Sequence, residues 1–258
     1  DMGILGAGLA TAMGVCMSVF MMLTHFRSPI NTMCFVPVAR LPEIFGKIAA
    51  NGFSSFIIDI AMGVLTMLFN RQIMRCLGSD ALAVYAVIVN ISTFVQCCAY
   101  GVGQAAQPII SQNYGAGRSD RVSQLLRYCL ISCAVIGAAW TAAVIALPNG
   151  FIKLFMSPTA AVLAIAPEIM RIYAVSFLLL PYNVFSTYYF QAMLRPGTSV
   201  VISVSRGIVI SGALIMLLPL LLGSNSVWFA MPIAEAATAI YVTLSIAKVQ
   251  KAFQKPEC

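Results

Sequence analysis

Long apolar runs separated by short polar connections form the pattern of this chain. A helix needs about 20 mainly apolar residues to cross the hydrocarbon core of a bilayer. Stretches of that length lie at about residues 5–26, 48–70, 81–112, 128–147, 172–194 and 198–247. The last stretch is interrupted by Gly223-Ser-Asn-Ser226, so it predicts two helices, and the whole chain predicts about seven membrane spans.

The connections carry signals for turns and helix ends. "LRPG" (Leu194–Gly197) predicts a tight turn, and "PNGFIKLFMSP" (Pro148–Pro158) predicts a short helix at the membrane surface with aromatic anchors. Residues 160–194 predict one long helix that is broken or bent near Pro181, because proline cannot donate a backbone hydrogen bond.

The glycine-rich stretch "YGVGQAAQPIISQNYGAGRSDR" (Tyr100–Arg121) poses a choice between a nucleotide-binding loop and a helix end. Gly101-Val-Gly103 lacks the third glycine of GxGxxG and follows no strand, so the loop interpretation is very weak. We interpret the stretch as the end of a membrane helix, where Gly115 and Gly117 allow the turn.

Composition narrows the class of protein. The 258 residues are 60% hydrophobic and 9% charged, with a mean hydropathy of +0.93, whereas soluble domains carry about 25% charged residues. These values predict an all-α, polytopic membrane helix bundle. The net charge of +7 comes from basic residues that stand singly at the ends of apolar runs, which indicates membrane topology rather than nucleic-acid binding.

The residue types give little support for a catalytic site or a metal site. The single histidine, His25, cannot form a histidine metal cluster or complete a Ser-His-Asp triad. The eight cysteines show no CxxC spacing, so we expect them to act as small buried apolar residues. We expect no enzyme activity and no cofactor.

Basic residues are divided unevenly between the two sides of the predicted bundle. One side receives Arg27, Arg40, Lys47, Arg118, Arg121, Arg127, Arg195, Lys248, Lys251 and Lys255, and the other receives Arg71, Arg75 and Lys153. Because basic connections stay in the cytoplasm, ten against three predict a cytoplasmic C-terminus and, with seven spans, an outer Asp1. We expect a multi-pass plasma-membrane protein, located in the inner membrane if the source is bacterial.

Asp59 is the clearest ionisable residue inside a predicted span. It is central among the 23 residues between Lys47 and Arg71. A charge at this depth costs about 2.5–3.5 kcal/mol on insertion scales, so it usually has a partner or a function. Asp59 is therefore a candidate site for proton or cation coupling; the alternative is a static partner such as Arg206.

Two other charges lie within predicted spans. Glu235 follows Pro232 by three residues, and proline frees a backbone carbonyl around which a polar pocket could form. Helix packing or a shallower position explains Glu235 equally well. For Arg206, which lies toward the cytoplasmic end of its helix, we expect snorkelling to the membrane surface.

Uncharged polar residues form stripes on two predicted helices. One stripe holds Asn90, Ser92, Thr93 and Gln96, and the other holds Tyr182, Asn183, Ser186, Thr187, Tyr189 and Gln191 beside Pro181. Helix–helix hydrogen bonds explain any single member. Two stripes together, with a proline bend beside one, favour a water-filled cavity.

Three segments resemble the multidrug and toxic compound extrusion (MATE) family of secondary antiporters. "YAVIVNISTFVQCCAYGVGQAAQPIISQNYGAGRSDRVSQLLRY" (Tyr85–Tyr128) resembles the family's eighth helix and the loop to the ninth. "FQAMLRPGTSVVISVSR" (Phe190–Arg206) resembles its tenth-to-eleventh turn, and "GILGAGLATAMG" (Gly3–Gly14) the entry to its sixth helix. The resemblance covers nearly the whole chain.

The resemblance implies a lobe of a twelve-helix protein whose two lobes enclose a central cavity. Residues 1–26 would be the last helix of an otherwise missing N-lobe, 27–47 a cytoplasmic linker, 48–250 the six-helix C-lobe and 251–258 a cytoplasmic tail. Because the chain begins at Asp1 with no basic stretch before its first apolar run, we expect a fragment rather than a signal peptide.

The resemblance also implies a function, namely export of amphipathic, often cationic compounds in exchange for Na⁺ or H⁺ by alternating access. Family members often place an acid in helix seven. Asp59 lies about one turn before that position, where Met62 stands, and Asn183 is the polar residue nearest the acid that some members carry in helix ten. The expected partners are drug-like small molecules, the bilayer and the missing N-lobe.

Two alternatives remain open. A flippase for lipid-linked precursors shares this two-lobe architecture but would need a more cationic cavity than Arg206 supplies. A truncated, non-transporting fragment is the other alternative, and an in-frame five-helix extension in the upstream DNA would exclude it.

Overall fold

The computed structural model describes residues 3–27 and 41–254. Within these ranges the side chains of residues 3, 4, 7, 41, 43, 44, 46–59, 61, 62, 252 and 254 are not described. The described backbone is helical and contains no strand. It divides into two units, Asp1–Ala50 and Asn51–Cys258. Each unit is described by itself below.

The first unit contains α1 (Gly3–Thr24), the short 3₁₀ turn η1 (His25–Arg27) and the beginning of α2 (Leu41–Gly115). α2 consists of two helices that meet at Gly78, whose φ of 84° and ψ of −171° are not helical. α1 has no charged residue, and Gly8–Arg27 is long and apolar enough to cross a membrane. The first predicted span therefore exists as a helix.

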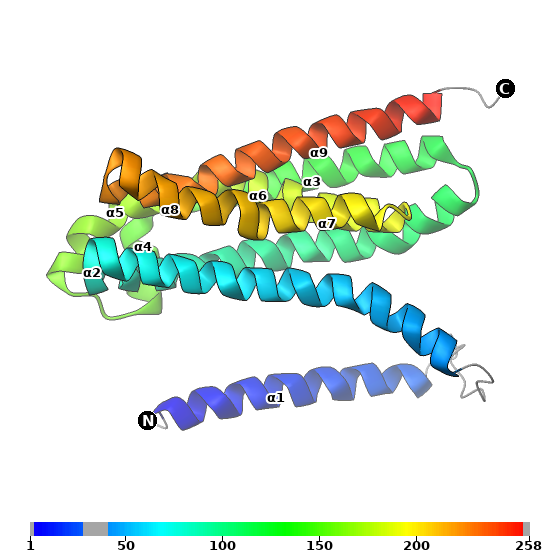
Figure 1. Cartoon of the computed structure of the whole chain (residues 1–258). Coiled ribbons are helices and arrows are strands. Elements are labelled where there is room, and N and C mark those ends of the chain that lie inside the picture. Colours follow the sequence, from blue (N-terminus) through cyan, green and yellow to red (C-terminus); the bar gives the residue numbers. More distant parts are fainter. Residues whose placement is uncertain (1–2, 28–40, 255–258) are drawn as a thin grey trace. The chain divides into compact units, whose positions relative to one another are not determined.

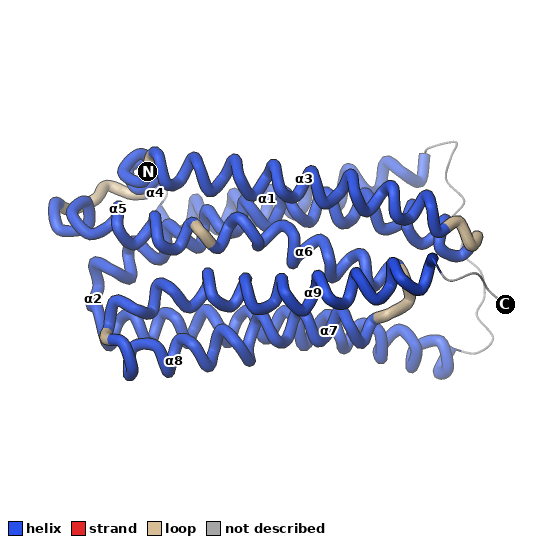
Figure 2. The backbone as a smooth tube through the Cα atoms, turned by 90° about the horizontal axis from the view of Figure 1, so that it is seen from above, coloured by secondary structure: helices blue, strands red, loops and turns tan. Residues whose placement is uncertain are grey.

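The second unit is a bundle of long helices that run up and down along one axis (Figures 1 and 2). After α2 the chain forms α3 (Ser119–Ala146), α4 (Pro148–Phe155), α5 (Ala160–Ala174), α6 (Ser176–Ala192), α7 (Pro196–Val204), the π-helical turn η2 (Ser205–Val209), α8 (Ile210–Leu222), η3 (Ser224–Phe229) and α9 (Ala230–Gln254). The start of α3, the start of α7 and the end of α9 lie at one end of this bundle, and α4 and α5 lie at the other (Figure 1).

Helix ends fall where the turn signals predict them. α2 ends at Gly115, and Gly117 adopts φ 70°, a conformation that glycine accepts without strain. Arg118 N donates to Asn113 O at 2.9 Å, which closes the last turn. The turn after α6 uses the same pattern, with Leu194 at φ 57° and Arg195 N donating to Phe190 O at 2.9 Å.

The long helix predicted over residues 160–194 is broken at a different place from the one expected. α5 and α6 meet at Val175 with a bend of 40°, and Pro181 lies inside α6. Pro181 has no N–H to offer the carbonyl four residues earlier, so the distortion develops on its N-terminal side rather than at the proline.

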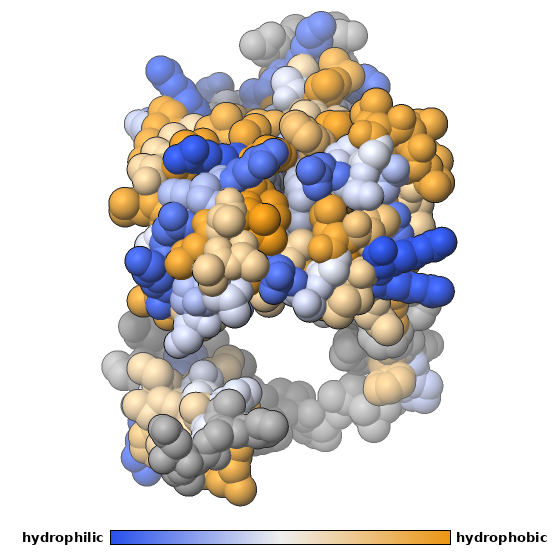
Figure 3. All heavy atoms as spheres, turned by 90° about the vertical axis from the view of Figure 1, so that its left-hand side faces the viewer, coloured by the Kyte–Doolittle hydropathy of each residue, from blue (hydrophilic) through white to orange (hydrophobic). Residues whose placement is uncertain are grey.

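The bundle buries one face of each long helix and leaves apolar side chains outside. In α3 the buried residues are Val122, Leu126, Cys129, Cys133, Gly137 and Val144, which recur at helical spacing. Ile131 and Val135 on the other side are 52% and 63% exposed. Seen end-on from the side of α4 and α5, hydrophilic side chains interrupt a largely hydrophobic surface (Figure 3).

Five helices of the described part are long and apolar enough to span a membrane, and α5 with α6 makes a sixth if the bent pair counts as one span. The remaining predicted span, 48–70, falls largely on residues whose side chains lie outside the description. The expected class, an all-α polytopic membrane bundle, is confirmed.

The cysteines differ in part from the expectation that they are buried. Cys129 and Cys133 are buried on one face of α3, as their spacing indicates. Cys97 and Cys98, however, are exposed on α2.

Candidate functional site

A buried polar network joins α6, η2 and α9. Arg206 Nε donates to Glu235 Oε1 at 2.6 Å, and Asn183 Nδ2 donates to Glu235 Oε2 at 2.6 Å. The same amide nitrogen lies 2.9 Å from the backbone oxygen of Glu235. The Glu235 side chain is fully buried and that of Arg206 is 11% exposed. The expected snorkelling of Arg206 is therefore wrong: its guanidinium points to a carboxylate inside the bundle.

The backbone around Arg206 departs from an ordinary α-helix. η2 is π-helical over Ser205–Val209, and Ile210 N donates to Ser205 O. The Ser211 hydroxyl donates to Arg206 O at 2.5 Å and satisfies that carbonyl. A π turn holds one residue more than an α turn and changes the direction in which side chains point, and here Arg206 lies within it.

Both carboxylate oxygens of Glu235 are engaged, one by a cation and one by an amide. A buried charge is tolerated in a low-dielectric interior when it is paired and hydrogen-bonded. This geometry favours a neutral cross-link between three helices over an open cation site.

Asp59 lies on α2, and its side chain falls outside the described residues. Its proposed coupling role stays a prediction. Arg206, the partner considered for it, is bonded to Glu235 instead.

The two polar stripes occupy different environments. On α2, Asn90 Nδ2 donates to Ala86 O at 2.9 Å on its own helix, and Tyr100 Oη lies 3.4 Å from Gln96 Oε1. On α6, Asn183 and Ser186 are fully buried. The first stripe thus has exposed members and the second has buried ones within the second unit, and the water-filled cavity that the stripes favoured stays a prediction.

Tyr182 has a partner that the sequence did not indicate. Its hydroxyl lies 2.8 Å from Thr243 Oγ1 on α9. Together with Asn183–Glu235, this contact makes two polar links between α6 and α9. Tyr182, Asn183, Glu235 and Thr243 stand among other polar residues of α6 and α9, and their spacing does not indicate which of them pair.

No group of three or more His, Cys, Asp or Glu residues is placed to hold a metal ion within the described ranges. The polar groups brought together are thus an ion pair, amides and hydroxyls.

Solved structures share this fold. An outward-facing multidrug resistance MATE family transporter of the MOP superfamily superposes with a TM-score of 0.83 at 20% identity, covering 98% of this chain and 58% of that one. A MOP superfamily transporter from Pyrococcus furiosus, whose binding pocket is described as having reversed polarity, gives 0.83 at 18% identity, with 99% and 58% covered. An inward-facing multidrug resistance MATE transporter gives 0.76 at 17% identity, with 100% and 60% covered.

The chain thus spans about 58% of the length of these solved proteins. No curated protein matches it. The MatE family model matches residues 53–217, which is more than half of the chain. The chain therefore belongs to the MatE family.

Proposed function

We propose that this chain supplies helix six and the C-terminal lobe of a secondary antiporter that exports amphipathic, often cationic compounds in exchange for Na⁺ or H⁺. The membrane-spanning bundle and the family membership support transport as the general activity. Substrate class, coupling ion and the rest of the protein belong to the proposal.

The observation that carries the proposal is an exposed, partly polar face on α2. Asn90, Thr93, Tyr100 and Gln104 recur at intervals of three, seven and four residues and are all exposed in the second unit. They lie within Gly78–Gly115, a candidate membrane span. Polar side chains at such positions face a bundle interior or a water-filled cavity rather than lipid, so this face suits the wall of a substrate path.

The buried network of Arg206, Glu235 and Asn183 supports the proposal as well, because it holds three elements of the lobe together. Alternating access is largely a rocking of one bundle against the other, and rocking requires each bundle to move as a unit. Arg206, Glu235 and Asn183 connect η2, α9 and α6 through hydrogen bonds of 2.6 Å. In this proposal Glu235 and Arg206 stiffen the lobe, and Asp59 is the group that binds the coupling ion.

The test uses the full-length protein in proteoliposomes, with Na⁺ and pH gradients imposed separately and efflux of a cationic dye measured. Asp59→Asn is expected to abolish gradient-driven efflux, and drug resistance in cells, while expression stays at the wild-type level. Asp80→Asn changes an exposed acid of α2 that lies just beyond the kink at Gly78, and it is expected to leave efflux unchanged. Unaltered efflux in Asp59→Asn would remove Asp59 from the coupling step, and no efflux under either gradient in wild type would refute the antiporter itself.

A flippase for lipid-linked precursors is less well supported. Such a protein would use a cationic cavity to hold the phosphates of its substrate, and Arg206, the cation considered for that role, is paired with Glu235.

A further inference from the structure

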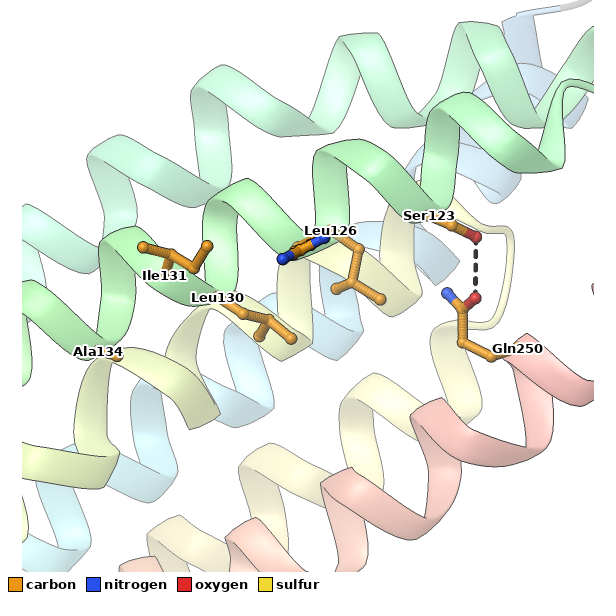
Figure 4. Close-up of a pocket in the computed structure, with 7 residues that line it drawn as sticks. Ser123, Leu126, Leu130, Ile131, Ala134 and Gln250 are labelled. Carbon is orange, nitrogen blue, oxygen red and sulfur yellow. Dashed lines mark hydrogen bonds between the residues drawn. The ribbon is translucent and has the colours of Figure 1, made fainter.

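An open groove lies between α3 and α9 on the outside of the bundle. It has a volume of about 500 Å³ and is lined by Ser123, Leu126, Arg127, Leu130, Ile131, Ala134 and Gln250 (Figure 4). Six of these seven residues belong to α3, and Gln250 belongs to α9. The Ser123 hydroxyl donates to Gln250 Oε1 at 2.8 Å and closes one end of the groove.

The groove changes character along its length. Its closed end is polar, with Ser123, Gln250 and the exposed side chain of Arg127. From Leu126 to Ala134 the other lining residues are apolar. Ser123 and Ala134 are separated by 11 helical positions, or about 16 Å, which is close to half of a hydrocarbon core of about 30 Å. The groove therefore has the depth of one lipid leaflet.

We expect the polar end of the groove to lie at the level of a membrane surface. Tyr128, next to Arg127, is 58% exposed, and its hydroxyl accepts a hydrogen bond from Gln124 Nε2 at 3.2 Å. Exposed tyrosines of this kind collect at the headgroup level of membrane proteins. The start of α3 and the end of α9, which carry the polar residues, lie at the same end of the bundle (Figure 1).

Charge at this end favours an anion. Besides Arg127, which lines the groove, the exposed basic residues at the start of α3 and the end of α9 include Arg121, Lys248 and Lys251, and the exposed acid there is Asp120. Basic pockets between membrane helices bind anionic lipid headgroups, and each basic residue near the surface contributes about 1 kcal/mol of attraction.

We propose that this groove is a binding site for one anionic phospholipid. The guanidinium of Arg127 binds the phosphodiester, and an acyl chain lies against Leu126, Leu130, Ile131 and Ala134. The lipid fills the space that α3 and α9 leave between them beyond the Ser123–Gln250 contact. The proposal does not depend on which compound the protein transports.

Native mass spectrometry of the detergent-solubilised 258-residue chain tests the proposal, with phosphatidylglycerol and phosphatidylcholine of identical acyl chains added at equal concentrations. Wild type is expected to retain one phosphatidylglycerol in preference to phosphatidylcholine. Arg127→Gln is expected to weaken phosphatidylglycerol binding roughly fivefold. Arg118→Gln, which removes an exposed arginine outside the groove, is the matched control and is expected to bind like wild type.

A second variant tests the acyl-chain half of the site. Ala134→Phe fills the apolar part without changing charge and is expected to lower retention of phosphatidylglycerol. Inorganic phosphate is expected not to displace the lipid. Equal retention of the two lipids by wild type, an equal loss in Arg118→Gln and Arg127→Gln, unchanged binding in Ala134→Phe, or displacement by phosphate alone would each overturn the proposal.

Discussion

The ion pair of Arg206 and Glu235 determines how η2 and α9 pack, but it adds little to the free energy of unfolding. Bringing two charges into a low-dielectric interior costs several kcal/mol per ion, which the mutual attraction only about offsets. Removing one partner leaves an unpaired charge, and that state is far less stable than either the intact pair or an apolar replacement of both. The pair therefore fixes which faces of η2 and α9 meet.

Single and double substitutions separate these contributions. Arg206→Met is expected to lower the free energy of unfolding by about 3–5 kcal/mol, because the Glu235 carboxylate keeps only the Asn183 amide. The double variant Arg206→Met with Glu235→Met is expected to be more stable than Arg206→Met alone. Thermal unfolding of the chain in nanodiscs measures the difference, and Arg171→Met, at an exposed arginine that donates to Ile145 O, is the matched control. A double variant at least as unstable as the single variant would contradict the account.

Sequence reasoning identified Arg206, Glu235 and Asn183 separately as candidates but did not connect them. Glu235 and Asn183 lie near the middle of their apolar segments, whereas Arg206 lies toward the cytoplasmic end of its helix, so a contact among the three was not predictable from depth alone. The extra residue in the π turn of η2 turns Arg206 toward α9, and hydrophobic periodicity contains no signal for such a turn. Snorkelling was therefore expected where pairing occurs.

The packing of α3 against α6 depends on the break between α5 and α6. Where α6 begins, the backbone oxygens of Phe177 and Leu178 come close to Gly137 of α3. A Cβ atom on Gly137 would lie 2.6 Å from Leu178 O and 3.0 Å from Phe177 O. Small residues allow such close approach between membrane helices, and these obstacles are backbone atoms that cannot rotate away.

Gly137→Ala is expected to destabilise the protein by about 1–3 kcal/mol through overpacking, although alanine is the better helix former. Gly101→Ala places the same methyl group on α2, where nothing lies within 4 Å, and is expected to leave stability unchanged or slightly raised. Thermal unfolding in detergent compares the two variants. Equal stability of the two would mean that α3 and α6 separate easily at this point.

At the scale of single helices, the sequence indicated how long each helix is but not where a helix bends. Helix ends at Gly115, Leu194 and Gly223 were predictable from turn residues, and the lengths of the apolar runs predicted the five or six spans that the described part contains. The position of the break at Val175 was not, because Pro181 marks a missing hydrogen bond but does not fix where the helix bends to compensate.

Six basic residues of the second unit lie at one end of the bundle. Arg118, Arg121, Arg127, Arg195, Lys248 and Lys251 belong to the start of α3, the turn before α7 and the end of α9, which lie together in Figure 1. Lys153 belongs to α4 at the opposite end. These six basic residues and Lys153 are thus separated by the length of the bundle, as a charge-based orientation requires.

This separation predicts the orientation in the membrane. Translocation of a connection rich in Lys and Arg is unfavourable, so the end that carries Arg118 is expected to face the cytoplasm and α4 the outside. Two reporters test it in a variant whose eight cysteines are replaced: Ala116→Cys in the exposed turn before α3, and Asn149→Cys in α4, also exposed. In intact cells a membrane-impermeant maleimide is expected to label Asn149→Cys at once and Ala116→Cys only after permeabilisation. The reverse order would place the basic end outside, and the predicted cytoplasmic C-terminus would then be wrong, since α9 ends beside the start of α3.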